Sequence, residues 1–164
     1  MTGSIKRHDS KDMIKREKIK DLLETTEFDR EVTVMGWVRT FRNNQFIAIN
    51  DGSCMGTIQI VVDFNNTPEQ LLKRITTGAA VAVTGTIVES IGNGQRVDVK
   101  VTTIEILGDS DPEKFPLQPK KHSLEFLREI AHLRFRTNTF NAVFKVRHAL
   151  AFAIHKFYNE RGFV

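Results

Sequence analysis

The feature that most constrains the fold of this chain is an alternation of apolar and polar residues that begins at Glu31. Side chains alternate between the two faces of a β-strand, so this pattern predicts strands with one buried face. Similar segments, rich in β-branched and aromatic residues, recur as far as Leu107 and are separated by turns. Gly36, inside the first segment, predicts a bulge or a sharp bend. We expect strands over residues 31–41, 46–50, 57–64, 80–90 and 96–107.

A helix signal lies between the third and fourth of these segments. Thr67 is expected to be the N-cap, with Pro68 at the first helical position and the helix ending near Ile75. Three strands, a helix and two further strands follow one another in an OB-fold, which is a small Greek-key barrel. An antiparallel sandwich has similar strand signals, but the helix placement and the glycines favour the barrel. We therefore expect a mainly β, five-stranded OB-fold barrel over residues 28–109.

Residues 1–27 are expected to form a basic helical extension. Ser10 is the candidate N-cap of a helix that ends near Thr25, and its thin apolar stripe requires it to dock on another element. Basic residues outnumber acidic ones in this segment, and the whole chain has a net charge of +4. Both a phosphate-contacting arm and an ordinary solvated helix face are compatible with this charge. The basic residues are Lys6, Arg7, Lys11, Lys15, Arg16, Lys18 and Lys20.

The segment after the expected barrel consists of a linker followed by two expected helices. Residues 110–121 contain three prolines and have no periodicity, which predicts an extended linker. Ser123 is expected to cap a helix that ends near His132. Residues 140–161 are expected to form a longer helix that ends at Gly162 and carries a broad aromatic face. So wide a face needs a large partner surface, and we expect residues 122–164 to be the start of a larger, truncated domain.

Catalytic and metal-binding patterns are missing from the sequence. It has no glycine-rich phosphate loop, no nucleophile elbow and no zinc-ligand spacing among its five histidines and single cysteine. His148 and His155 lie on one expected helix without a third ligand, which favours packing or interface roles. No apolar run approaches the roughly 20 residues of a membrane helix, and no signal peptide is recognisable. The lone Cys54 is typical of a reducing compartment, so the cytoplasm is the expected location.

The expected barrel predicts a face that binds single-stranded nucleic acid. OB-folds use aromatic side chains that stack on bases and polar side chains that hydrogen-bond to base edges. Phe46 lies near the start of the second expected strand and Gln59 in the middle of the third. Arg39 and Arg42 lie near the end of the first strand, and the fold lets them approach the same surface. The alternating pattern does not decide whether the Phe46 side chain points into the core or toward a ligand, whereas Trp37 is expected in the core.

Several motifs resemble the N-terminal anticodon-binding domain of asparaginyl-tRNA synthetases, which form class IIb with the aspartyl and lysyl enzymes. The motifs are VMGWVRT (residues 34–40) and FIAINDGS (46–53), followed by Gln59. HSLEFLREIAHLR (122–134) and RTNTF (136–140) resemble the approach to the first class II motif, a dimer interface in an α+β domain. The NDGS turn favours the asparaginyl over the aspartyl enzyme.

The resemblance implies that particular residues read the anticodon of an asparagine-accepting tRNA. Phe46 matches a phenylalanine that stacks on an anticodon base, and Gln59 matches a glutamine that hydrogen-bonds to the central uridine. Arg42 matches an arginine that contacts the anticodon stem-loop. Asp98 falls where the group often has a glutamate near the third base. Arg39 is included because the first strand brings it toward the same surface.

The resemblance also implies an activity for the parent protein. Such enzymes join asparagine to its tRNA through an asparaginyl-adenylate, use ATP and Mg²⁺, and form homodimers. The second and third class II motifs are absent from this chain, so we expect it to bind tRNA without a cofactor and to lack aminoacylation activity. Phe135 and Asn141 depart from the family pattern, which usually has proline and glycine there. The alternatives are an aspartyl-tRNA synthetase fragment, a free-standing single-strand-binding OB-fold protein and a protein-interaction module.

Overall fold

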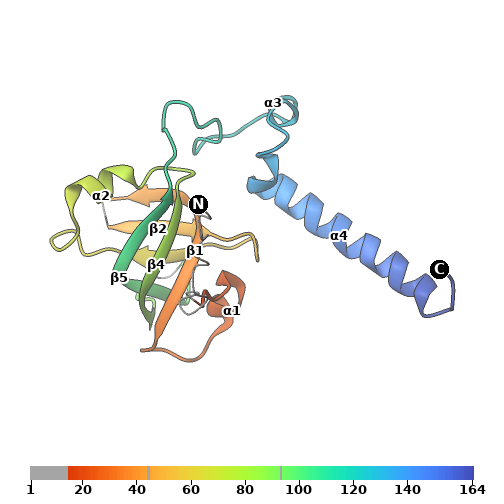
Figure 1. The fold of residues 1–164 in the computed structure, drawn as a ribbon, viewed down its shortest axis with the longest axis horizontal. Coiled ribbons are helices and arrows are strands. Elements are labelled where there is room, and N and C mark those ends of the chain that lie inside the picture. Colours follow the sequence, from red (N-terminus) through yellow and green to blue (C-terminus); the bar gives the residue numbers. More distant parts are fainter. Residues whose placement is uncertain (1–14, 44, 93) are drawn as a thin grey trace, which may run out of the picture.

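Five strands close into a barrel in the computed structural model, which describes residues 15–43, 45–92 and 94–164 (Figure 1). They are β1 (Glu31–Arg42), β2 (Phe46–Asn50), β3 (Ile58–Val61), β4 (Ala80–Glu89) and β5 (Val97–Gly108). The order around the barrel is β1-β2-β3-β5-β4, in which β3 and β5 run parallel and the other paired strands antiparallel. The predicted OB-fold is therefore confirmed. Asn44 and Asn93, expected in two of the turns, lie outside the described residues.

The alternation that predicted the strands also defines the core. Inward-facing aliphatic residues of all five strands are fully or nearly fully buried and form one cluster, and burial of each contributes roughly 1.5–3 kcal/mol. Gly36 faces this core, where a Cβ atom would lie 2.7 Å from the carbonyl oxygen of Asn50. The register of β1 and β2 shifts between Val38 and Thr40, which places a bulge at Arg39 and not at Gly36.

The helix between β3 and β4 is shorter than expected. It is α2 (Glu69–Arg74), and its N-cap is Pro68, which makes no side-chain cap. The prediction that Thr67 caps this helix is wrong, because the Thr67 hydroxyl instead donates a 2.7 Å hydrogen bond to the carbonyl oxygen of Asp63. This bond stabilises the turn that leads out of β3.

The N-terminal helix also begins later than expected. It is α1 (Ile19–Glu24), whereas the expected cap Ser10 and the basic residues Lys6, Arg7 and Lys11 lie outside the described residues. Residues 15–18 are not helical, because the Glu17 N–H donates to the carbonyl oxygen of Thr33 at 2.8 Å. The segment therefore runs beside β1, where the Glu17 carboxylate also forms a 2.8 Å ion pair with Arg30.

The turn after β2 caps α1 from a distance. The N–H of Ile19 donates to Asp51 Oδ2 at 3.0 Å, and the N–H of Lys20 donates to Ser53 Oγ at the same distance. Ile19 and Leu22 are buried in the barrel core, which confirms that the thin apolar stripe docks on another element. The helix thus closes one side of the barrel (Figure 1).

Two helices and a short 3-10 helix follow the linker. They are α3 (Leu124–Glu129), η1 (Arg134–Arg136) and α4 (Asn138–Asn159). Ser123 caps α3 as predicted, but the helix ends before His132 because the backbone of Ile130 leaves the helical region. Thr137 caps α4, and Gly162 adopts a φ of 79° just beyond its end.

Helix α4 extends away from the barrel (Figure 1), and none of its residues is buried. In the described part of the chain, no helix has the length and apolar character needed to cross a membrane. The exposed large apolar residues of α4 are Val143, Val146, Leu150, Phe152, Ile154, Phe157 and Tyr158.

Candidate nucleic-acid interface

Four of the five predicted site residues lie on one outer face of the barrel. In the ladders, Arg42 of β1 is opposite Phe46 of β2, and Ala48 of β2 is opposite Gln59 of β3. Gln59 is in turn opposite Asp98 of β5. Paired residues project from the same face of a sheet, and the residues between them point into the core. The outer face is defined here as Arg42, Phe46, Ala48, Gln59, Val61, Asp98 and Lys100.

The exposure of these residues differs along the outer face. Arg42 is exposed, whereas Phe46 and Gln59 are half-buried, so each still presents atoms to a ligand. Phe46 therefore does not belong to the core, which the sequence pattern had left open. An aromatic ring beside an amide is a combination that binds unstacked bases, since the ring stacks and the amide hydrogen-bonds to the base edge.

Asp98 is the exception on this face, because it is buried and only 8% exposed. Its carboxylate accepts hydrogen bonds from three neutral donors. Ser90 Oγ donates at 2.9 Å, Gln59 Nε2 at 3.4 Å, and Gln95 Nε2 donates as well. The Asp98 carboxylate therefore contacts Gln59, Ser90 and Gln95 more than it contacts solvent.

The structure does not bring Arg39 together with the other predicted residues. Arg39 occupies the β1 bulge, and its guanidinium donates to the carbonyl oxygen of Arg136 and, at 3.2 Å, to Asn138 Oδ1. Burial lowers the pKa of the Arg39 guanidinium from its usual value. The side chain thus lies at the junction between the barrel and α4.

Trp37 was expected in the core, and that expectation is wrong. It pairs with Asn50 and alternates with the buried Val38, so its indole lies outside the barrel and is half-buried. The Arg136 guanidinium covers it, with Cζ 4.3 Å from the ring centroid. This is a cation–π contact that also shields the ring from solvent.

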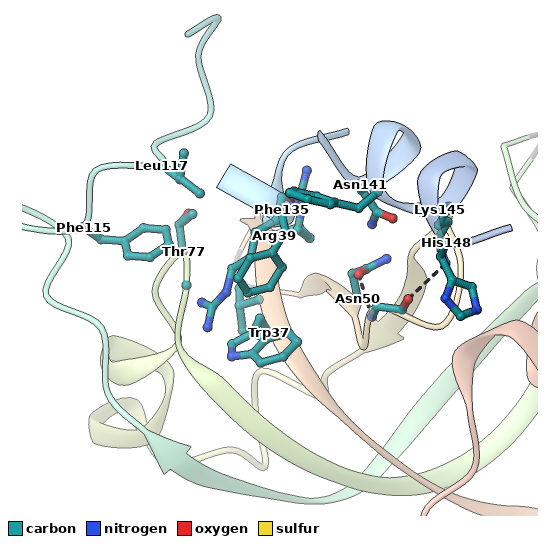
Figure 2. A pocket seen from close by; sticks show the side chains of 15 residues that line it. Trp37, Arg39, Asn50, Thr77, Phe115, Leu117, Phe135, Asn141, Lys145 and His148 are labelled. Carbon is teal, nitrogen blue, oxygen red and sulfur yellow. Dashed lines mark hydrogen bonds between the residues drawn. The ribbon is translucent and has the colours of Figure 1, made fainter. Parts of the chain in front are cut away.

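A cavity of about 430 Å³ lies at this junction (Figure 2). Trp37 forms part of its wall, Phe115 of the linker lies on one side, and Lys145 and His148 of α4 lie on the other. Lys145 Nζ donates to the carbonyl oxygens of Gly52 and Ser53, each at 3.2 Å. The turn that caps α1 therefore also holds α4.

Sequence reasoning missed Lys100, which belongs to the outer face, and Phe64, which lies beside it. Phe64, expected at the end of the third strand, lies beyond it and is 53% exposed. Phe64 and Lys100 line a recess of about 640 Å³, and Lys100 pairs with Val61 next to Phe46. The available signal was an aromatic residue directly before the polar turn at Asn65.

No group of three or more histidine, cysteine or acidic side chains is placed to hold a metal ion within the described residues. The interface consists of aromatic, amide and cationic groups around the buried carboxylate of Asp98. Such a set is suited to binding. The carboxylates whose pKa is lowered lie elsewhere: Glu17 and Asp109 pair with arginines, and Asp51 and Glu125 accept hydrogen bonds from serine side chains and backbone N–H groups.

Comparisons with known proteins agree with this geometry. The tRNA anti-codon family model, described as an OB-fold nucleic acid binding domain, matches residues 32–107. Asparagine–tRNA ligases of Parabacteroides distasonis and Phocaeicola vulgatus are 55% and 56% identical to this chain over 153 residues, which is 92% of its length. The chain spans about a third of the length of these curated relatives, 33% and 32% respectively.

A solved structure shows the same arrangement of elements. Asparaginyl-tRNA synthetase from Pyrococcus horikoshii, complexed with asparaginyl-adenylate, superposes with a TM-score of 0.77 and 25% sequence identity. The match covers 92% of this chain and 35% of that one. The chain therefore corresponds to the N-terminal region of asparagine–tRNA ligases, with an OB-fold nucleic acid binding domain between residues 32 and 107.

Proposed function

We propose that this chain binds the anticodon loop of an asparagine-accepting tRNA through the outer face. The observation that carries the proposal is the placement of Phe46 and Gln59 on adjacent, paired strands, with both side chains partly accessible. One base would stack on the Phe46 ring, a contact worth roughly 1–3 kcal/mol. The Gln59 amide lies close enough along the ladder to hydrogen-bond to the edge of a neighbouring or the same base.

Positive side chains flank these two residues. Arg42 is exposed and opposite Phe46, and Lys100 is exposed on the other side of Val61. Phosphate groups between the splayed bases would contact these cations, which accounts for affinity but not for base choice. The exposed Phe64 ring offers a second stacking surface at the end of the same face.

We also infer the properties of the parent enzyme from the relatives, which are asparagine–tRNA ligases. It would ligate asparagine to tRNA with ATP and Mg²⁺ in the cytoplasm. The chain spans about a third of the length of these relatives, so the aminoacylation activity and the use of ATP and Mg²⁺ are proposed for the parent enzyme and not for this chain. The exposed apolar residues of α4 would pack against a second copy in a homodimer.

The function is tested with an RNA stem-loop that carries GUU in the anticodon position. Binding to the purified chain is compared with that of stem-loops in which only the central uridine or only the third base is changed. We expect at least about tenfold weaker binding when the central uridine becomes cytidine, the size of a typical base-edge contact. The anticodons for asparagine and aspartate differ at the third base. Tighter binding with uridine than with cytidine at that base would therefore indicate an asparagine-specific domain, and the opposite preference an aspartate-specific one.

Two variants assign that preference to the outer face. Phe46→Ala weakens binding about tenfold or more, whereas Phe46→Trp retains it because the indole also stacks. Gln59→Ala weakens binding and removes the preference for uridine at the central position. Equal binding of all stem-loops with a steep salt dependence would instead identify a non-specific single-strand binder and contradict the proposal.

A further inference from the structure

We propose that Asp98 is a positioning residue that fixes the amide orientation of Gln59 and so makes this site select bases with an imino N–H. The inference rests on the proposed function. It differs from the expectation for Asp98, which was a place near the third base of the anticodon. The juxtaposition that supports it is a buried carboxylate directly across the β3–β5 ladder from the base-reading amide.

The chemistry of the two side chains determines the orientation. An ionised carboxylate only accepts hydrogen bonds, whereas a glutamine amide has a donor end and an acceptor end. Gln59 Nε2 lies 3.4 Å from Asp98 Oδ1. Rotating the amide by half a turn would place its oxygen against the carboxylate oxygen, two acceptors in a site shielded from water, which is strongly unfavourable.

The position of Asp98 itself is held from the β4–β5 connection. Ser90 Oγ donates to Oδ2 at 2.9 Å, and the Gln95 amide donates to Oδ1. Among the described residues, no lysine, arginine or histidine forms an ion pair with Asp98. Because no cation competes for the carboxylate, its oxygens remain available to the amide of Gln59.

The fixed orientation leaves the Gln59 oxygen as the acceptor offered to a ligand. Uracil N3–H and guanine N1–H are donors that match it, whereas N3 of cytosine and N1 of adenine are acceptors that repel it. Without Asp98 the amide could rotate and accept either kind of base at little cost. Asp98 therefore contributes to selectivity although it is too buried to be the main contact of a base.

The test is Asp98→Asn, which keeps the shape of the side chain but offers both a donor and an acceptor. The dissociation constants of the GUU stem-loop and its central-cytidine variant are measured with the same protein preparation, so an inactive fraction cancels from their ratio. We expect the preference for uridine, at least about tenfold in the original chain, to fall to about twofold or to reverse. Asp21→Asn, the same change at an exposed position of α1, should leave the ratio unchanged.

The outcomes separate this inference from the proposed function. If the original chain shows no preference at the central base, the proposed function fails first. If the original chain prefers uridine and Asp98→Asn retains the full ratio, the positioning role alone is overturned. If the Asp98→Asn variant does not fold, the inference can still be tested on the original chain. In the free protein, the Gln59 side-chain amide proton that is bonded to Asp98 should exchange slowly with water, as measured by NMR. Rapid exchange of both protons would also overturn the inference.

Discussion

The guanidinium of Arg39 donates a hydrogen bond to the backbone carbonyl of Arg136, and this contact joins the bulge of β1 to the 3-10 helix that precedes α4. A second bond from Arg39 to Asn138 Oδ1, 3.2 Å long, holds the first residue of α4. The same strand carries Arg42 of the outer face three residues later. Strand β1 thus connects the candidate RNA surface with the junction to the C-terminal helices.

Replacing Arg39 should loosen this junction and leave base reading intact. Arg39→Ala removes two charge-assisted hydrogen bonds, a partly buried one to the carbonyl oxygen of Arg136 and an exposed one to Asn138, and we expect a loss of about 1–2 kcal/mol in the free energy of unfolding. Limited proteolysis should cut residues 133–138 several times faster. The preference for uridine at the central position should not change. Loss of that preference in Arg39→Ala would instead indicate that Arg39 contributes to RNA binding.

Lys100 and Phe64 should contribute to affinity in different ways. Lys100→Ala weakens binding of all stem-loops to a similar degree, because a phosphate contact is lost. The logarithm of the binding constant then falls less steeply with the logarithm of the salt concentration, and the magnitude of this slope decreases by about 1. Phe64→Ala weakens binding by roughly 1–3 kcal/mol with little change in that slope, because stacking is not electrostatic. Titrations at several salt concentrations distinguish them. If Phe64→Ala binds like the original chain, the recess beside the outer face does not hold a base.

The exposed apolar residues of α4 should cause self-association. A contiguous exposed apolar patch of this kind is typical of an interface. Leu150 is 60% exposed and Ile154 58% exposed, and the two lie one turn apart on the same face of the helix. We expect the 164-residue chain to associate in light scattering and a chain shortened to residues 1–121 to remain monomeric. The double change Leu150→Glu and Ile154→Glu in the full chain should also restore the monomer; a shortened chain that aggregates more would contradict the prediction.

Asp51 should make the docking of α1 sensitive to acid. Burial raises the pKa of Asp51, but hydrogen bonds from Ser53 and from the N–H of Ile19 lower it more, and the net shift is downward. A group with a lowered pKa contributes stability above its unfolded pKa of about 3.9 and loses that contribution as the pH falls through the lowered value. Asp51→Asn should therefore reduce the melting temperature at pH 7. The difference from the original chain should shrink below about pH 4, and an unchanged difference would argue against this role.

The strands and the barrel could be predicted from the sequence because they depend on local alternation. β2 occupies residues Phe46–Asn50 as expected, and β1, β4 and β5 differ by no more than about one residue at each end. The Ser123 cap of α3 was likewise predictable, since a cap is an interaction between residues three apart. The comparisons then agreed with the family resemblance carried by the VMGWVRT and FIAINDGS motifs.

The tertiary structure decided where contacts between distant segments override local pattern. Residues 15–18 run beside β1 instead of forming part of the helix, because Thr33 and Arg30 satisfy the polar groups of Glu17. A one-residue bulge turns Arg39 toward Arg136, which lies almost a hundred positions away and covers Trp37. The alternating sequence of β1 contains no sign of that bulge at Arg39.

For Asp98, the sequence predicted the position of the residue, and the tertiary structure determined its contacts. Its sequence position indicated a place near the outer face, and the ladder confirms that it lies opposite Gln59. Its donors Ser90 and Gln95 reach it within the β4–β5 hairpin, but the hydrogen bond from Gln59, 39 positions away, forms only when β3 pairs with β5 in the barrel. The sequence by itself thus determined the strands and the residue types of the interface, because period-two burial is local. The barrel closure decided which side chains face a ligand and which orient a neighbour, because those contacts join strands that are far apart in the chain.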